Sequence, residues 1–318
     1  SVFLTEVIIM SVNLKELTHK SNPLTEGHRM CPGCGAPTAI RQALMAVEDP
    51  VVVVGATGCM EVSTTVYPYS SWQVPFMHVA FENAGAGISG VEAAYRALRR
   101  NGRTKENIKF VSFGGDGGTY DIGLQSLSGA LERGHDFTYI CYNNQGYMNT
   151  GAQRSSATPL SANATTSPAG SVIPGKLQRA KDLTEIVAAH NIPYVAQTTL
   201  HNPADLISKV KRAVETPGPA FVNILAPCVL FWKIEPQEQM KLCSLAADSR
   251  FWPVYEVVNG EYSLSYRPKK EVPLEEFLRA QGRYSHLFKK GKERMDLVAA
   301  AQADVDDNWK KLLKKCGG

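Results

Sequence analysis

Two neighbouring stretches decide the fold: Ile108-Lys-Phe-Val-Ser-Phe-Gly114-Gly115-Asp116-Gly117-Gly118, and Phe137-Thr-Tyr-Ile-Cys-Tyr142-Asn143-Asn144. Each begins with a β-branched or aromatic run, which predicts strands at 108–114 and 137–142, and the segment between them predicts a helix at 121–133. A strand, a helix and a second strand in this order form a βαβ unit with parallel strands. Asp116 and Asn144, which lie 28 residues apart in the chain, are therefore expected side by side at one edge of the sheet.

The same alternation continues on both sides of this unit. We expect five strands, at 51–55, 108–114, 137–142, 194–197 and 220–225, and helices near 90–100, 121–133, 183–190 and 203–215. This pattern predicts an α/β fold with a mostly parallel sheet and helices on both faces. Ligands of open α/β sheets bind at the carboxyl ends of the strands, so the chemistry is expected there.

Three regions follow from the pattern. Residues 1–22 are interpreted as a lead-in, residues 23–230 as the ligand-binding domain, and residues 231–318 as an extension that packs on partner subunits. Within the domain, residues 143–179 are rich in Ser, Thr, Ala, Gly and Asn and show no period. An irregular segment of this length is typical of an active-site loop.

Composition excludes several classes of protein. The 318 residues carry 34 basic and 30 acidic side chains, a formal net charge of +4 that is scattered along the chain, which argues against nucleic-acid binding. No run of 18 apolar residues is present, so no membrane span is expected. The first nine residues contain Glu6 and no basic segment, which argues against a secretory signal. We therefore predict a cytoplasmic protein.

The glycines around Asp116 indicate a phosphate site. Gly115, Gly117 and Gly118 allow the main chain to approach a diphosphate, and the following helix adds the positive end of its dipole. The Asp116 carboxylate, the Asn144 side-chain oxygen and a main-chain carbonyl at about Gly146 are oxygen ligands of the kind Mg²⁺ prefers. A dinucleotide site is the weaker interpretation, because no G-x-G-x-x-G follows the first strand. Gly-Asp-Gly followed by Asn-Asn resembles the diphosphate-binding half of thiamine enzymes.

Four of the seven cysteines are candidate metal ligands. Cys31 and Cys34 form a C-x-x-C pair, Cys59 follows the first predicted strand and Cys228 follows the last. Four thiolates suit either a [4Fe-4S] cluster or structural zinc, and their spacing alone does not decide between the two. A thiamine cofactor beside them favours the cluster, which gives electrons an outlet that zinc lacks. Cys141, Cys243 and Cys316 are interpreted as packing or incidental residues.

Together these motifs resemble the beta subunit of 2-oxoacid:ferredoxin oxidoreductases, most closely the pyruvate type. The segments that carry the resemblance cover most of the chain and are Gly27-His28-Arg29, Cys31-Pro32-Gly33-Cys34-Gly35, Thr57-Gly58-Cys59-Met60-Glu61, Phe81-Glu82-Asn83, residues 114–134, Tyr147-Met148-Asn149-Thr150-Gly151, Ser155-Ser156-Ala157-Thr158-Pro159 and Ala226-Pro227-Cys228.

The resemblance implies a role for each candidate residue. It implies that a [4Fe-4S] cluster is bound by Cys31, Cys34, Cys59 and Cys228, and that Mg²⁺ and thiamine diphosphate are bound by Gly115, Asp116, Gly117, Gly118, Asn144 and the Gly146 carbonyl. Asn149 is implied to face the substrate. An alpha subunit would supply the activating glutamate and substrate-binding residues. A further ferredoxin-like cluster-carrying subunit or domain, and ferredoxin as acceptor, are the other implied partners.

The implied reaction is oxidative decarboxylation of a small 2-oxoacid, with release of CO₂ and single-electron transfer through the cluster to ferredoxin. The substrate stays open between pyruvate and oxalate. Pyruvate-type relatives commonly carry acidic residues beside the motif Asn, whereas this chain has Asn143 and Gln145, and a loss of negative charge there would favour a dianion such as oxalate. Two other classes remain: a non-redox thiamine lyase or synthase subunit with structural zinc, and a non-catalytic scaffold subunit that carries the cluster.

Overall fold

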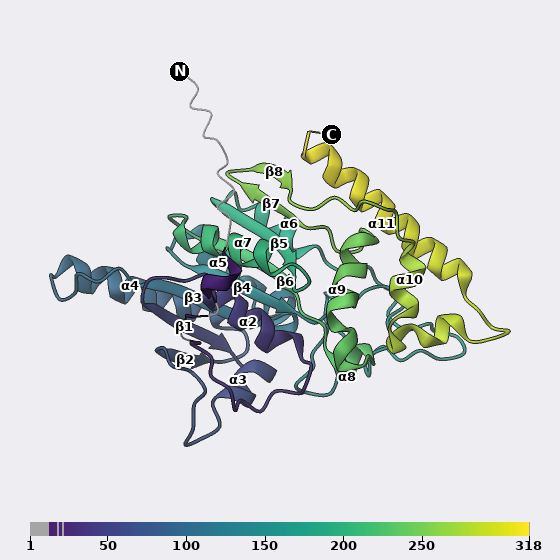
Figure 1. Cartoon of the computed structure of the whole chain (residues 1–318), viewed down its shortest axis with the longest axis horizontal. Helices are drawn as coiled ribbons and strands as arrows, with labels where there is room; N and C mark the ends of the chain where they lie inside the picture. Colours follow the sequence, from purple (N-terminus) through teal and green to yellow (C-terminus); the bar gives the residue numbers. More distant parts are fainter. Residues whose placement is uncertain (1–12, 18, 21, 318) are drawn as a thin grey trace.

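The structure is a computed structural model that describes residues 13–17, 19–20 and 22–317, so the predicted absence of a signal in the first nine residues lies outside it. At its centre is an eight-stranded sheet with the order β2-β1-β3-β4-β6-β5-β7-β8 (Figure 1). The strands are β1 (Val51–Ala56), β2 (Phe76–Val79), β3 (Lys109–Gly115), β4 (Thr138–Asn143), β5 (Tyr194–Thr199), β6 (Ala220–Leu225), β7 (Tyr255–Val258) and β8 (Glu261–Leu264). The first six strands pair in parallel, and β7 and β8 add to the sheet in antiparallel orientation.

The predicted fold class is confirmed, and the five predicted strands all form, with ends within two residues of those expected. Three strands were not expected. β2 is a four-residue edge strand that is only partly buried, and β7 and β8 are equally short. Each of these strands has only four residues, so even the alternating burial of β7 and β8 covers just two periods and gives little signal in the sequence.

Helices cover both faces of the sheet. They are α1 (Leu14–Leu17), α2 (Gly35–Met45), α3 (Cys59–Thr64), α4 (Ala84–Arg100), α5 (Leu124–Glu132), α6 (Leu183–Ala188), α7 (Pro203–Glu215), α8 (Val229–Trp232), α9 (Gln239–Asp248), α10 (Leu274–Arg279) and α11 (Met295–Lys315), with the π-helical segment η1 (Gly117–Ile122) and the 3₁₀ segments η2 (Pro236–Glu238) and η3 (Gly282–Phe288). Local chemistry sets several of their ends. Asn202, for example, accepts a hydrogen bond from the Asp205 N–H and Pro203 follows it, which is a favourable start for α7.

Two hydrophobic cores lie on opposite faces of the sheet, because successive side chains of a strand point to opposite sides. Val53 packs in a core with α2 and α7, whereas its neighbour Val54 packs in a core with α4, α5 and α6. Since both faces are covered, the central strands β4, β5 and β6 are buried along their whole length. The edge of this rigid sheet therefore offers a firm support for a site.

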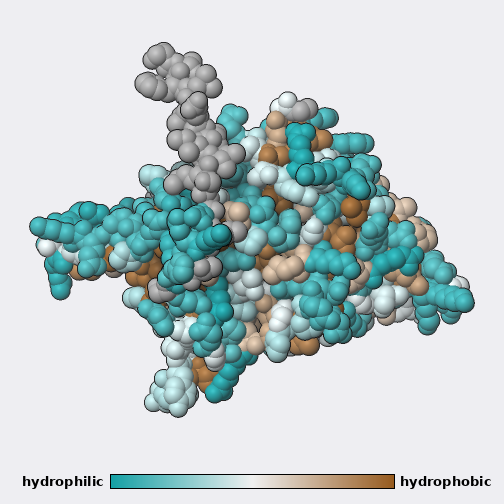
Figure 2. All heavy atoms as spheres, viewed as in Figure 1, coloured by the Kyte–Doolittle hydropathy of each residue, from teal (hydrophilic) through white to brown (hydrophobic). Residues whose placement is uncertain are grey.

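The C-terminal region shares a core with the sheet. A third core joins Leu225 at the end of β6 and Trp232 at the end of α8 to side chains of α9, α10, η3 and α11. The long helix α11 lies on the side of the molecule opposite to the projecting helix α4 (Figure 1). On the face seen in Figure 2 hydrophilic residues predominate, with hydrophobic ones scattered between them. The predicted contact of residues 231–318 with partner subunits stays a prediction.

None of the helices in the described part of the chain is long and apolar enough to span a bilayer.

Candidate cofactor and metal site

Four candidate ligands emerge in a row at the carboxyl edge of the sheet. Cys59 follows β1, Asp116 follows β3, Asn144 follows β4 and Cys228 lies just beyond β6. These four strands are direct neighbours in the order β1-β3-β4-β6. The sheet thus places Asp116 and Asn144 next to each other, with a cysteine on either side, and the Asn144 main-chain N–H donates to Asp116 Oδ1 at 3.1 Å.

The Asn144 side-chain amide lies between Asp116 Oδ1 and the Gly146 carbonyl oxygen. One end of the Asn144 amide lies 2.9 Å from Asp116 Oδ1 and 2.8 Å from the Gly146 carbonyl oxygen. As an NH₂ group, this end donates a hydrogen bond to each oxygen. As the amide oxygen, it completes a set of three oxygens, and neighbouring ligands of octahedral Mg²⁺ stand about 2.9 Å apart when each bond is about 2.0–2.1 Å. Both distances from the Asn144 amide therefore match those between neighbouring ligands of a magnesium ion.

The burial of Asp116 supports the same fit. The side chain has no exposed surface, and burial raises the pKa of its carboxyl to about 7, although hydrogen bonds from Ser155 and Asn144 partly offset the effect. Ser155 Oγ donates to Asp116 Oδ2 at 2.5 Å, which leaves Oδ1 facing Asn144. A carboxylate buried without a positive partner is costly, and a bound cation removes that cost.

A cavity of about 140 Å³ opens above these groups. Its walls include most of the residues predicted for cofactor binding and one predicted cluster ligand, namely Gly115, Gly117, Gly118, Asn144, Gly146, Asn149 and Cys59. Asp116 does not line the cavity, because its side chain is fully buried. Asn149, by contrast, is an exposed residue of the wall. The structure thus places the predicted diphosphate motif and Cys59 around one cavity.

The helix after the motif begins earlier than predicted. We expected it to start at about Asp121, but a π-helical turn, η1, begins at Gly117 and is followed by α5. Gly123, at the junction, allows this close path, since a Cβ there would lie 2.1 Å from the Gly118 carbonyl oxygen. Gly117 has a packing role as well, because a Cβ on it would lie 2.6 Å from the Tyr147 ring. Turns of this kind are frequent at functional sites.

The four cysteines lie on three segments of the chain, and the Gln239 side chain joins two of these segments. Cys34 and Cys228 each precede a helix, α2 and α8, and Cys59 is the first residue of α3. Gln239 Nε2 donates to the Gly33 carbonyl at 2.8 Å and to the Pro227 carbonyl at 3.2 Å.

The four thiols interact electrostatically, but they are not arranged around one position where a single ion could bind. Burial raises the pKa of Cys34 to about 12 and that of Cys59 to about 11, and charge on the other cysteines raises both further. Cys34 in this way interacts with Cys31, Cys59 and Cys228. Within the described residues, however, no three His, Cys, Asp or Glu side chains are grouped so that they could hold one metal ion.

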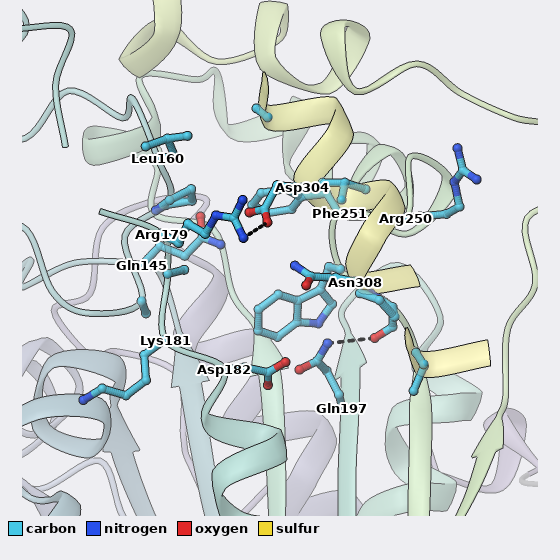
Figure 3. Close-up of a pocket in the computed structure, with 18 of the residues that line it drawn as sticks. Gln145, Leu160, Arg179, Lys181, Asp182, Gln197, Arg250, Phe251, Asp304 and Asn308 are labelled. Carbon is cyan, nitrogen blue, oxygen red and sulfur yellow. Dashed lines mark hydrogen bonds and ion pairs between the residues drawn. The ribbon is translucent and has the colours of Figure 1, made fainter. Parts of the chain in front are cut away.

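A second cavity, of about 340 Å³, lies between the sheet and α11 (Figure 3). Asn143 and Gln145 line this cavity and do not line the first one. Asn143 Nδ2 donates to the Tyr120 hydroxyl at 2.8 Å, and Gln145 Oε1 accepts from Arg283 at 2.6 Å. The neutral amides beside Asn144 therefore face away from the predicted reaction centre, and the charge argument for oxalate loses its geometric basis.

Three residues that support the site were not predicted to have a role. Ser155 lies in a motif that carries the family resemblance, but no function is predicted for it, whereas Gln239 and Arg283 lie in the extension, outside every motif. Their partners are 39, 206 and 138 residues away, respectively. Contacts at such sequence separations leave no periodic signal in a single sequence.

Comparison with known proteins places these features in a family. The family described as thiamine pyrophosphate enzyme, C-terminal TPP-binding domain, matches residues 56–224. The pyruvate synthase subunit PorB of Thermotoga maritima is 47% identical, with 96% of each chain covered. The ketoisovalerate oxidoreductase subunit VorB of Pyrococcus horikoshii is 40% identical, with 91% of each chain covered.

One solved structure shares the fold. The 2-oxoglutarate:ferredoxin oxidoreductase from Magnetococcus marinus superposes with a TM-score of 0.54 at 22% identity, over 71% of this chain and 81% of that one. At this identity the likeness concerns the fold alone. The identities to PorB and VorB are much higher and extend over nearly the whole length of the chain. The chain therefore belongs to the thiamine pyrophosphate enzyme family, among the beta subunits of 2-oxoacid:ferredoxin oxidoreductases.

Proposed function

We propose that this chain is the thiamine-diphosphate-binding and cluster-carrying subunit of an oxidoreductase that decarboxylates a small 2-oxoacid and passes the electrons to ferredoxin. The observation that carries the proposal is the row of Cys59, Asp116, Asn144 and Cys228 on adjacent strands. In this proposal the row provides a diphosphate and cation site beside thiols that bind a redox centre. When bound, thiamine diphosphate supplies an electron sink for decarboxylation, and a [4Fe-4S] cluster accepts single electrons.

The residues around the first cavity would bind different parts of the Mg²⁺ and diphosphate group. Asp116, Asn144 and the Gly146 carbonyl would hold Mg²⁺, which balances the charge of the diphosphate. Gly117 and Gly118 leave the main chain bare toward the cavity.

The other walls of the cavity limit water and face the substrate. Phe81, Tyr147 and Met148 contribute apolar surface, which restricts the access of water to the reaction. Asn149 is placed at the exposed rim, where its amide can hydrogen-bond to a carboxylate or carbonyl of the substrate.

A cluster suits the four cysteines better than structural zinc. Four thiolates on one Zn²⁺ stand about 3.8 Å apart, because each Zn–S bond is about 2.3 Å and the geometry is tetrahedral. In a [4Fe-4S] cluster each thiolate binds a different iron, so the sulfurs surround a larger space. The four thiols interact with one another electrostatically, and beside a thiamine cofactor a cluster gives single electrons an outlet that zinc lacks. Each of the seven cysteines is a free thiol.

Partners are expected to complete the site. We propose that an alpha subunit supplies the glutamate that activates the cofactor and the residues that bind the substrate carboxylate. A further cluster-carrying subunit or domain would conduct the electrons to ferredoxin. PorB is by its name one subunit of pyruvate synthase, which supports an assembly of this kind. The chain alone is expected to be inactive.

Pyruvate is the first substrate to test, because several PorB subunits are 47–49% identical to this chain. The 40% identity to VorB makes a branched 2-oxoacid the second candidate. Oxalate stays a candidate without support from the geometry of Asn143 and Gln145.

The decisive experiment is anaerobic purification of the native complex, followed by analysis of iron, sulfide, zinc, thiamine and magnesium. Viologen reduction would then be assayed with pyruvate, 3-methyl-2-oxobutanoate, oxalate and 2-oxoglutarate. We expect thiamine, Mg²⁺, iron and sulfide in the complex and reduction with pyruvate. Zinc in place of iron would support the non-redox class, and a cluster without thiamine would support the scaffold class. Reduction with oxalate but not with pyruvate would reject the pyruvate assignment.

A further inference from the structure

Arg283 is a fully buried arginine whose hydrogen bonds do not neutralise its charge. Its Nε donates to Gln281 Oε1 at 2.9 Å and one terminal nitrogen donates to Gln145 Oε1 at 2.6 Å, and both acceptors are neutral amides. The other terminal nitrogen, Nη1, is buried and has no partner among the described residues. Burial lowers the pKa of the guanidinium to about 10, so it is still charged at neutral pH.

A buried cation in this state is costly unless negative charge lies near it. Two groups with which Arg283 interacts electrostatically are Cys228 and Asp116. Arg283 thus lies within electrostatic reach of both halves of the site.

The geometry around α8 explains this position. Trp232 is the last residue of α8, and the guanidinium carbon of Arg283 lies 3.9 Å from the centre of its ring. The Trp232 main-chain N–H donates to the Cys228 carbonyl at 2.9 Å, and the Trp232 indole N–H donates to the Asn144 carbonyl at 2.9 Å. The Arg283–Trp232 stack therefore supports the segment that joins a predicted cluster ligand to a predicted Mg²⁺ ligand.

We propose that Arg283 is a positioning residue that supplies buried positive charge to the cluster at Cys228 and thereby raises its reduction potential. The inference rests on the proposed function, since it requires that cluster. One-electron reduction makes the cluster more negative by one charge, so a nearby cation stabilises the reduced form more than the oxidised form. The electron comes from the external reductant in the test and from the substrate during turnover.

Three variants separate charge from packing. Arg283→Met removes the charge but retains an apolar side chain that can lie on Trp232. Arg283→Lys retains a positive charge but loses the planar stack and the fixed fork of donors. Arg250→Met is the control, because Arg250 is ion-paired with Glu271 and Asp306 at 3.1 Å each, on the side of α11.

The test is a redox titration of the anaerobically purified complex with dithionite and mediators, monitored by electron paramagnetic resonance. The signal to follow is the one that Cys228→Ser removes. In Arg283→Met we expect a shift to more negative potential, so that the ratio of reduced to oxidised cluster at the wild-type midpoint falls about tenfold. Arg283→Lys should stay close to wild type, and Arg250→Met should not differ from it.

Every other outcome supports or overturns the proposed role of Arg283, or the proposed function on which it rests. An unchanged midpoint in Arg283→Met with intact cluster content overturns the inference, as does an equal shift in Arg283→Met and Arg283→Lys, which would indicate a packing role. If Arg283→Met does not assemble, Arg283→Gln serves as the neutral variant, and loss of the cluster in both with retention in Arg283→Lys supports the requirement for charge. If the wild-type complex has no signal that depends on Cys228, the proposed function fails rather than the role of Arg283.

Discussion

Ser155 Oγ donates a hydrogen bond of 2.5 Å to Asp116 Oδ2 across 39 residues of sequence. The bond joins the long loop after β4 to the end of β3. It also fixes the orientation of the carboxylate, because it occupies Oδ2 while Oδ1 faces the Asn144 amide. Ser155 itself is buried and is held by Thr158, whose hydroxyl accepts from the Ser155 main-chain N–H at 2.9 Å.

Replacing Ser155 with Ala should weaken the binding of Mg²⁺ and thiamine diphosphate. A hydrogen bond to a charged group contributes about 1.5–3 kcal/mol, so we expect binding to weaken about tenfold to a hundredfold. Titration calorimetry of the complex with thiamine diphosphate in the presence of Mg²⁺ measures the change. Ser156→Ala is the control, because Ser156 contacts Asp121 through its main-chain nitrogen, which Ala retains. Equal affinities for wild type and Ser155→Ala would show that the bond does not orient the carboxylate.

Replacing Asp116 with Asn should separate cofactor binding from folding. The amide has nearly the same shape but no charge, so the site loses its principal ligand for Mg²⁺ and the cost of a buried carboxylate disappears. We expect the variant to melt about a few degrees higher than wild type without cofactor. We also expect it to gain no stability from added Mg²⁺ and thiamine diphosphate. Thermal denaturation with and without both ligands tests the two statements, and a cofactor-dependent rise equal to that of wild type would contradict the ligand assignment.

The diphosphate motif could be predicted because its residues directly follow regular strands. Asp116 and Asn144 each follow a strongly apolar strand, so their proximity follows from the rule that parallel strands end at one edge. Cys59 and Cys228 were placed at the edge by the same rule. What the rule does not supply is the strand order, which sets the sequence of the four residues along that edge.

Support from the C-terminal region could not be predicted. Arg283 lies in η3, a turn without a hydrophobic period, and its burial depends on the aromatic side chains of Phe231, Trp232 and Tyr284 around it. A charged residue is expected at the surface unless its partners are known. The aromatic partners of Arg283 come from α8 and η3, whose packing against each other the sequence does not indicate.

Replacing Gln239 with Leu should loosen the cluster site. Leu cannot donate to the Gly33 and Pro227 carbonyls, so the Cys31–Cys34 loop and the Cys228 loop lose the side chain that joins them. The two lost bonds correspond to about 1–3 kcal/mol. We expect less iron and sulfide per complex after anaerobic purification and faster bleaching in air. Gln237→Leu, at an exposed neighbouring position, is the control, and equal iron content and bleaching rate in the two variants would contradict the proposed role.

Replacing Asn143 with Asp should change stability rather than substrate preference. Asn143 is buried and its Nδ2 donates to the Tyr120 hydroxyl, so a carboxylate there loses a donor and carries charge into the interior. Because the side chain faces the second cavity and neither of its hydrogen-bond partners, Tyr120 and Gln145, lines the first, we expect stability to change more than the ratio of kcat/KM for oxalate to that for pyruvate. The melting temperature should fall. A marked gain in preference for pyruvate would restore the argument that charge beside Asn144 selects the substrate.

Replacing Lys176 with Met should show how this buried lysine of the long loop makes the free energy of unfolding depend on pH. Lys176 is almost completely buried, and its Nζ donates to the carbonyls of Ser156, Thr158 and Arg179 at 3.3, 2.5 and 3.4 Å. Burial lowers its pKa to about 8 from 10.5. Between these values the unfolded chain binds a proton that the folded chain does not, so the free energy of unfolding of wild type should rise with pH relative to the variant.

Below about pH 8 the lysine is charged in both states, and the difference in stability between the two proteins should be constant. It should then increase in favour of wild type between about pH 8 and 10.5 and level off above that range. Urea denaturation of wild type and Lys176→Met at pH 7, 8.5 and 10 measures it. A difference that does not change across this range would mean that the three carbonyls keep the ammonium group protonated in the fold, with its pKa at the ordinary value.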